Sequence, residues 1–328
     1  MPGPRLAAAA LALLLVAAGC GSSDSDTTEA QPGTAAPSTD NSATETTNNN
    51  SGAAPTTMVE AAAVDVLVGL DELDAVTASA ILVDVRSADA YTEGHIEGAV
   101  NLPSNLLDDP DSTVGSQVSS AEVVADALGS VGIGPDDTVV LYDGTSSLYA
   151  ARVFFAARLY GHDDLRILDG GMVAWEAEGR PLSSEPATVE PVDYPVGDGT
   201  GAVRYELDDV TGHLDEGGTF ADARAGSEYT GETRFGDEEG GHIPGAVNLD
   251  WEQTVGADGR FLDTDTLRTL YADAGIGDDS PVVTYCYIGV RAAHTWFVLS
   301  ELLGYPDVAL YDGSWSEYGT TNGVEIES

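Results

Sequence analysis

The sequence predicts an α/β protein in which one parallel-sheet domain occurs twice in tandem. Short apolar, β-branched runs alternate with stretches whose apolar residues recur at helical spacing, such as 147–160 and 290–303. This alternation is typical of a parallel sheet with helices on both faces. One string of motifs also appears twice along the chain, which indicates a duplicated domain. With 328 residues, the chain is long enough for two such domains, each with its own core.

Four pairs of segments, one member in each half of the chain, carry the repeat. They are 81–86 with 219–224, 94–102 with 241–249, 132–143 with 275–286, and 168–171 with 311–314. We therefore expect a first domain at 58–187 and a second domain at 202–328. The segment between them, 188–201, is rich in Pro, Glu, Gly and Asp and is expected to be the inter-domain linker.

The first 57 residues carry signals of export rather than of a folded domain. The apolar run 6–18 follows a single Arg and is too short to span a membrane, which suits a signal-peptide core. The ending 16–20 (VAAGC) resembles the lipobox of bacterial-type lipoproteins. We therefore expect residues 1–20 to be a signal peptide, with a lipid on Cys20 that anchors the exported protein to the outer face of the cell membrane. Residues 21–57 are too poor in apolar side chains to fold and are expected to be a disordered tether.

The charge of the chain excludes one class of function. It has 56 acidic residues against 12 basic ones, all of them Arg, and a formal charge of −44. Nucleic-acid binding needs a basic footprint, so it is not expected here. The acidity instead suggests a protein that stays soluble in strong salt, where self-repulsion is screened. The sequence also lacks a Cys/His cluster of metal-ligand spacing and a phosphate-binding loop in the right context, so we expect no metal and no cofactor.

The chemistry is concentrated in the stretch 282–296. A β-branched run ends at Cys286, Gly289 and Arg291 follow, and an apolar helical pattern comes next. We expect a buried strand, a tight loop and a helix start, which together aim backbone N–H groups and the positive end of the helix dipole at one point. A thiolate at that point is favoured by these groups and by Arg291. The alternative is a buried structural cysteine. If Cys20 is lipidated, Cys286 is the single thiol of the mature chain.

The cysteine loop, the paired D-x-R and GHI-x-GAVNL segments and the ending 311–315 (YDGSW) together resemble the two-domain rhodaneses, which are thiosulfate and 3-mercaptopyruvate sulfurtransferases. The resemblance covers about residues 60–325. It implies two rhodanese-like domains, an inactive N-terminal one packed on a catalytic C-terminal one, with the site in the cleft between them. It also implies that Cys286 is the catalytic residue and cycles through a persulfide.

The two copies differ as this division of labour requires. The nucleophile, the loop glycine and the arginine are all absent from the first copy, where their places are taken by Asp143, Ser146 and Leu148. A carboxylate in an anion-binding loop would repel anionic substrates. We therefore expect the first domain to be catalytically silent.

The reaction expected at Cys286 is a double displacement. The thiolate attacks the outer sulfur of a small anionic donor such as thiosulfate, sulfite leaves, and a thiophilic acceptor (a thiol or cyanide) then removes the sulfur. Loop N–H groups would stabilise the charged persulfide sulfur, and the predicted cradle is Tyr287, Ile288, Gly289 and Val290. Arg224 and Arg291 are predicted to hold the anionic end of the donor. Asp222 is predicted to support them by hydrogen-bonding the loop backbone.

Several alternatives remain open at this point. Phosphatases and arsenate reductases on a similar fold use one more residue between Cys and Arg, whereas four residues separate Cys286 from Arg291, so a sulfur cradle is favoured. The run 289–296 favours thiosulfate over 3-mercaptopyruvate, and a module that binds sulfane sulfur without turnover is a third possibility.

His294, like His95 and His242, is expected to be a packing residue. We expect a monomer.

Overall fold

The computed structural model describes residues 66–197, 203–236 and 238–328, all of which belong to one compact unit. The predicted signal peptide, the tether and Cys20 lie outside the described residues. Within the described part of the chain, no helix is long and apolar enough to cross a membrane.

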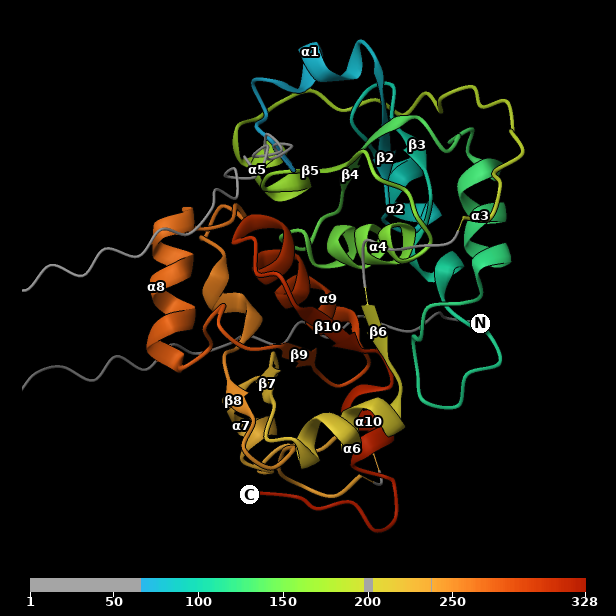
Figure 1. The fold of residues 1–328 in the computed structure, drawn as a ribbon. Helices are drawn as coiled ribbons and strands as arrows, with labels where there is room; N and C mark the ends of the chain where they lie inside the picture. Colours follow the sequence, from blue (N-terminus) through green and yellow to red (C-terminus); the bar gives the residue numbers. More distant parts are fainter. Residues whose placement is uncertain (1–65, 198–202, 237) are drawn as a thin grey trace, which may run out of the picture. The chain divides into compact units, whose positions relative to one another are not determined.

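The fold consists of two five-stranded sheets with the same strand order, and every pairing between strands is parallel (Figure 1). The first sheet has the order β1-β5-β4-β2-β3 and the second β6-β10-β9-β7-β8. The first comprises β1 (Leu67–Val68), β2 (Ala80–Asp84), β3 (Val100–Asn101), β4 (Thr138–Tyr142) and β5 (Leu165–Leu168). The second comprises β6 (Val203–Tyr205), β7 (Thr219–Asp222), β8 (Val247–Asn248), β9 (Val282–Tyr285) and β10 (Val308–Tyr311). The predicted fold class, two tandem α/β domains with parallel sheets, is confirmed.

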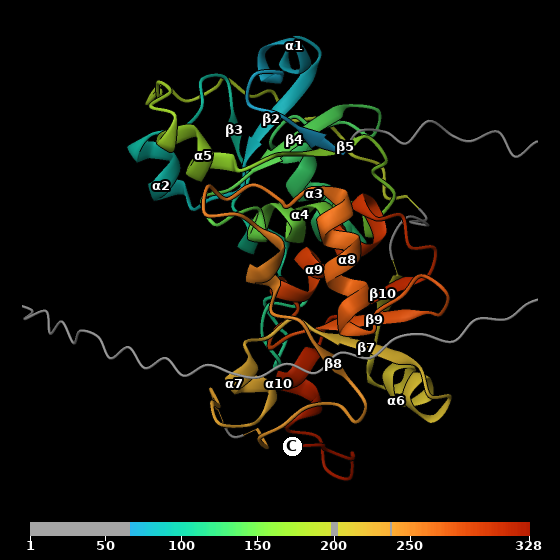
Figure 2. The same ribbon diagram turned by 90° about the vertical axis from the view of Figure 1, so that its left-hand side faces the viewer.

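Helices cover both faces of each sheet (Figures 1 and 2). In the first domain they are α1 (Leu73–Thr77), α2 (Ala88–Glu93), η1 (Ser104–Leu107), α3 (Ala121–Ser130), α4 (Leu148–Leu159) and α5 (Gly171–Ala177). In the second they are α6 (Leu207–Asp215), α7 (Gly226–Tyr229), η2 (Trp251–Thr254), α8 (Thr264–Ala274), α9 (Val290–Phe297), the π-helical turn η3 (Val298–Leu302) and α10 (Ser314–Tyr318). The stretch predicted as one helix at 290–303 is thus α9 followed by a π-helical turn.

The largest core cluster contains residues of both domains, and its centre is the contact between α4 and α9, which lie side by side in both views (Figures 1 and 2). The rings of Phe154 and Phe297 meet edge to face at 5.0 Å, as do those of Phe155 and Trp296. α4 is buried along most of its length, which explains why its sequence is apolar on nearly every side. The other face of each sheet has a separate core cluster within its own domain.

Two reciprocal hydrogen bonds also join the domains. The Val118 N–H donates to Asp312 Oδ2 at 2.7 Å, and the Phe261 N–H donates to Asp169 Oδ1 at 3.0 Å. Asp169 and Asp312 occupy equivalent positions of the repeat, after the last strand of each sheet. The contact between the two domains is therefore pseudo-symmetric, as expected when the two halves of a duplication pack on each other.

The described part of the predicted linker, 188–197, runs along the first domain. The Val192 N–H donates to Gly129 O at 3.0 Å, and Tyr194 Oη lies 2.9 Å from His162 Nδ1. Gly129 on α3 permits this approach, because a Cβ there would lie 2.4 Å from the Val192 carbonyl oxygen. These residues therefore pack as an extension of the first domain.

Candidate active site

The cysteine loop is hydrogen-bonded to the segment that follows β10, the last strand of the chain. Cys286, which is free and fully buried, follows β9 directly. Its N–H donates to Ser314 Oγ at 3.2 Å, and its carbonyl accepts the Trp315 N–H at 2.9 Å. The Tyr287 carbonyl accepts the Ser316 N–H at 3.0 Å. The YDGSW motif therefore fixes the loop in place, a role that sequence analysis did not assign to it.

Gly289 gives the loop its curvature. Its φ is +83°, in the left-handed region, and it caps the start of α9. A Cβ at this position would lie 2.7 Å from Asp312 Oδ1 and 3.0 Å from Asp312 O. The first N–H of α9 to bond inside the helix is that of Ala293, which donates to Gly289 O at 3.0 Å. The preceding N–H groups are those that a helix start offers to an anion.

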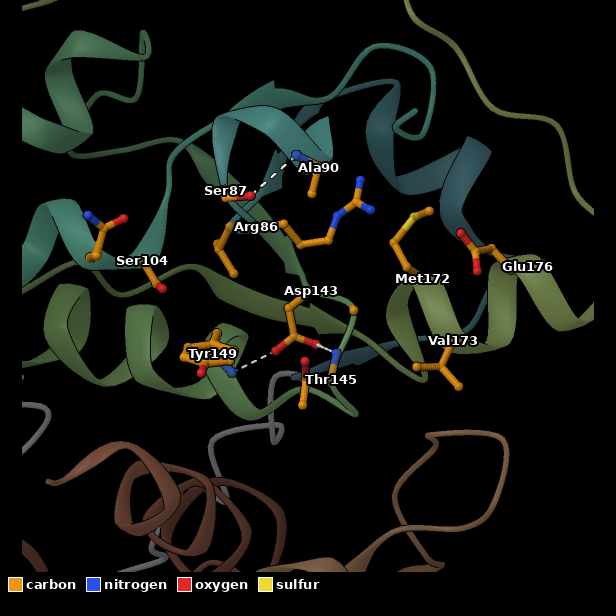
Figure 3. Close-up of a pocket in the computed structure, with 13 residues that line it drawn as sticks. Arg86, Ser87, Ala90, Ser104, Asp143, Thr145, Tyr149, Met172, Val173 and Glu176 are labelled. Atoms are coloured by element: carbon orange, nitrogen blue, oxygen red, sulfur yellow. Dashed lines mark hydrogen bonds between the residues drawn. The ribbon is translucent and has the colours of Figure 1, made fainter. Parts of the chain in front are cut away.

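The first domain, called the silent domain here because Asp143 replaces the cysteine, indicates where that anion binds, since the Asp143 side chain occupies its own loop. The carboxylate accepts backbone N–H groups from four residues, as Figure 3 shows in part. They are Thr145 at 2.8 Å, Ser147 at 3.0 Å, Tyr149 at 2.6 Å and Ala150 at 3.0 Å. A cavity of about 470 Å³ opens beside this carboxylate at the strand ends. The Asp143 carboxylate thus fills the anion site of the first domain, which is a second reason to expect that this domain is inactive.

The repeat relates this geometry to the second domain, which carries Cys286. Three of the donors to Asp143 correspond to the N–H groups of Ile288, Val290 and Ala292, and the fourth corresponds to that of Ala293, which in this copy donates to Gly289 O. Of the predicted cradle residues, Ile288 and Val290 therefore match donor positions, Gly289 provides the curvature, and Tyr287 lies between the nucleophile and the first donor. Ala292 was missed, although the matching donor position on α4 could have indicated it.

Arg224 and Asp222 form a buried scaffold pair. The Arg224 residue is 1% exposed, and its Nε and Nη2 donate to the Asp222 carboxylate at 2.6–3.0 Å. Nη2 also donates to Gly241 O at 2.9 Å, and the guanidinium lies 4.5 Å from the Trp315 ring centroid. Asp222 Oδ1 accepts the backbone N–H of Arg224, so it braces the loop after its own strand, β7.

The silent domain repeats this arrangement. Arg86 donates to Asp84 at 2.6–3.1 Å and to Gly94 O at 2.7 Å. A pair that is kept in a domain without the cysteine supports the fold, and this geometry favours a structural role for Arg224. Its predicted contact with the donor stays a prediction.

The duplication supplies a matched test of Arg224. We expect Arg224→Met and Arg86→Met both to lower the thermal midpoint, because each leaves an aspartate at a strand end without its partner. The thiosulfate KM of both variants is expected to stay within about threefold of wild type. Thermal denaturation and steady-state kinetics give the two readouts. A tenfold higher KM for Arg224→Met alone would restore its role as a donor ligand.

Arg291 has a different setting, because it pairs with Glu228 of α7. Its Nη1 and Nη2 donate to the two carboxylate oxygens at 2.6 and 2.8 Å. Burial lowers the pKa of Arg291, but the Glu228 hydrogen bonds and the charges of Cys286 and Glu228 raise it by more, so the net shift is upward. The predicted proximity of Arg291 to Cys286 is consistent with this effect. Glu228 was missed by sequence analysis, although Ala90 at its place in the silent copy was a usable signal.

The histidines are packing residues, as expected. His294 is fully buried between the Trp251 and Phe261 rings, with centroids at 5.0 Å from each. Burial lowers its pKa to about 3, so the ring is neutral near pH 7. His95 and His242 stack on tyrosines at 3.8 and 3.6 Å in equivalent positions of the two domains.

An arginine of the first domain lies against Gly289 of the cysteine loop. Arg152 of α4 is 3% exposed and pairs with Asp312, with Nη2 to Oδ1 at 2.7 Å. Its Nη2 also donates to the Ser116 carbonyl. Its Nη1 lies 3.3 Å from where a Cβ of Gly289 would stand. The buried pair thus joins α4, the turn after β10 and the cysteine loop. Within the described ranges, no group of three or more His, Cys, Asp and Glu side chains could hold a metal.

Comparison with known proteins agrees with this geometry. The model of the rhodanese-like domain matches residues 69–178 and 206–321. A protein of Mycolicibacterium smegmatis named "Putative thiosulfate sulfurtransferase" is 38% identical over 276 residues, which cover 80% of this chain and 98% of that protein. The sulfur carrier protein TtuD of Thermus thermophilus is 41% identical over 247 residues, covering 72% of this chain and 86% of that one.

Among solved structures, the anaerobic ergothioneine biosynthesis enzyme of Chlorobium limicola shares the fold. Its TM-score is 0.72 at 24% identity, and the match covers 80% of this chain and 70% of that chain. The family assignment rests on the two matched domains, the repeated sheets and the cysteine loop. The chain belongs to the rhodanese-like sulfurtransferases and contains two tandem rhodanese-like domains.

Proposed function

We propose that this protein moves the sulfane sulfur of thiosulfate to a thiophilic acceptor, a thiol or cyanide, through a persulfide on Cys286. The Cys286 thiolate bonds to the outer sulfur of thiosulfate while the S–S bond of the donor breaks, and its electron pair leaves with sulfite. The acceptor then takes the terminal sulfur and restores the thiolate. Thiosulfate as the donor is supported by the names of the relatives.

One observation carries the proposal. The loop of the first domain binds the Asp143 carboxylate through four N–H groups. Cys286 stands at the equivalent place, and the N–H groups of Ile288, Val290 and Ala292 stand at three of the four donor positions. A persulfide on Cys286 would carry its negative charge into that loop. Fixed N–H donors stabilise such a charge without reorganisation, as they do in an oxyanion hole.

Steady-state assay of the purified full chain, with thiosulfate and 3-mercaptopyruvate side by side and cyanide as acceptor, tests the proposal. The salt concentration is held high and constant because of the acidity of the chain. We expect double-displacement kinetics with thiosulfate. The absence of turnover with both donors, together with stable sulfur loading, would instead support a sulfur-binding module.

We also propose that the exported form begins at a lipidated Cys20 and sits on the outer face of the cell membrane. The sequence 16–20 and the polar stretch after it support this proposal. Cys20→Ala is expected to release the protein to the medium or to block its processing, as measured by fractionation and blotting. If the variant stays in the membrane fraction at its mature size, the anchor lies elsewhere.

A further inference from the structure

The ion pair between Glu228 and Arg291 is a feature of the catalytic copy that the reaction above does not use. Glu228 is 5% exposed, and both of its oxygens accept from Arg291, at 2.6 and 2.8 Å. Two parallel N–H to O bonds are the strong geometry for a guanidinium and a carboxylate. The positive charge of Arg291 is therefore matched before a donor arrives.

The duplication indicates that this pair belongs to the reaction rather than to the scaffold. The strand-end Asp-x-Arg pair is present in both copies with nearly the same distances. In the silent copy, by contrast, Ala90 stands in place of Glu228 and Leu148 in place of Arg291. Both partners thus occur only beside the cysteine. A pair needed for folding alone would be expected in both domains.

A second carboxylate lies near the same loop. Burial raises the pKa of Tyr287, and the charges of Glu238 and Glu228 raise it further. Glu238 is 3% exposed and accepts the Phe235 N–H at 2.6 Å, and the Phe235 ring centroid lies 5.1 Å from that of Tyr287. The second residue of the cysteine loop thus lies near two buried carboxylates, while Arg291 is already paired. A doubly charged donor therefore binds less favourably at this site than it would beside an unpaired arginine. Each of its negative charges is also repelled by both carboxylates.

We propose that Glu228 is a specificity residue that sets the charge of the sulfur donor. By matching the charge of Arg291, it penalises the second negative charge of thiosulfate relative to donors with one charge, such as thiosulfonates and organic persulfides. The loop N–H groups are left to bind the single charge of the persulfide. This inference rests on the proposed sulfur transfer at Cys286 and names the donor class that the site favours; thiosulfate is used, but at reduced affinity.

Two donors of matched shape test the inference. In methanethiosulfonate a methyl group replaces one oxyanion of thiosulfate, so the charge falls by one while the outer sulfur remains. The Cys286 thiolate takes that sulfur from either donor, and the electron pair of the broken S–S bond leaves with sulfite or methanesulfinate. With cyanide as acceptor, we expect Glu228→Gln to raise the ratio of kcat/KM for thiosulfate to that for methanethiosulfonate by about tenfold.

Two further variants separate charge from geometry. Glu232→Gln makes the same charge change at an exposed position four residues on and is expected to leave the ratio unchanged. The double variant Glu228→Met with Arg291→Met removes the pair at constant net charge, so its ratio is expected to stay near wild type even though kcat falls. If Glu228→Gln does not fold, the ratio of the two donors can still be measured in this double variant.

Two outcomes would overturn the inference: an unchanged ratio in Glu228→Gln, whether or not both activities fall, or an equal rise of the ratio in Glu232→Gln. Failure of the proposed function itself is recognised separately. In that case wild-type protein would not gain the mass of one sulfur after treatment with either donor.

Discussion

Cys286→Ser is expected to abolish sulfur transfer while the fold stays intact. The serine hydroxyl is a far weaker nucleophile than a thiolate, and no other cysteine occurs after residue 20. The side chain is fully buried and its backbone is fixed through Ser314 and Trp315, neither of which the substitution touches. Intact-mass spectrometry after thiosulfate treatment should show a gain of about 32 Da on wild type alone.

The control for this experiment is the same treatment followed by cyanide. Cyanide should remove the added sulfur from wild type and return the original mass. Circular dichroism should be the same for both proteins. Equal sulfur loading of wild type and Cys286→Ser would contradict the assignment of the nucleophile.

Arg152→Met is expected to destabilise the whole described unit, although Arg152 belongs to the silent domain. Its removal leaves the fully buried Asp312 side chain with a charge that only the Val118 N–H and the more distant Arg204, at 3.9 Å, oppose. Breaking one side of a buried ion pair costs about 3–5 kcal/mol. Activity should fall as well, because Asp312 lies against Gly289 of the cysteine loop. Chemical denaturation and steady-state kinetics measure the two effects.

A second substitution distinguishes the buried charge from lost packing. Adding Asp312→Asn to Arg152→Met removes the orphaned charge but keeps an acceptor for the Val118 N–H, so part of the lost stability should return. Arg166→Met, which breaks a half-buried pair with Asp164 at 3.4 Å, is the matched control in a more solvent-exposed pair and should change the stability less. If the double variant is less stable than Arg152→Met, the ion pair is not the cause.

Patterns local in sequence predicted the fold well. The repeat placed equivalent strands at 81–86 and 219–224, which the structure realises as β2 and β7, and the apolar stretch 147–160 became α4. Strand and helix periodicity depend on neighbouring residues and are visible in a single sequence. The loop at Cys286 was predictable for the same reason, since one short segment carries the strand end, the glycine and the helix start.

The partners of the charged side chains were not predictable in the same way. Glu228 and Arg291 lie on different elements, and Arg152 and Asp312 lie in different domains. No local pattern places such residues side by side, because their contact depends on the packing of α7 and α4 against the loop. Arg224 is the instructive case: its position after a strand predicted a cation that meets the donor, and the structure adds its pairing with Asp222, two residues earlier on the same face.

Asp143 keeps the loop of the first domain occupied by a side chain of the same chain. A neutral residue at that position would leave four inward-pointing N–H groups unbonded, and the loop would have to refold or bind a stray ion. An aspartate instead supplies a covalently attached anion that bonds these N–H groups permanently. In the proposed reaction, the loop of the first domain therefore stays occupied at every step. The helix that starts at this occupied loop, α4, is the one that packs against α9 of the second domain.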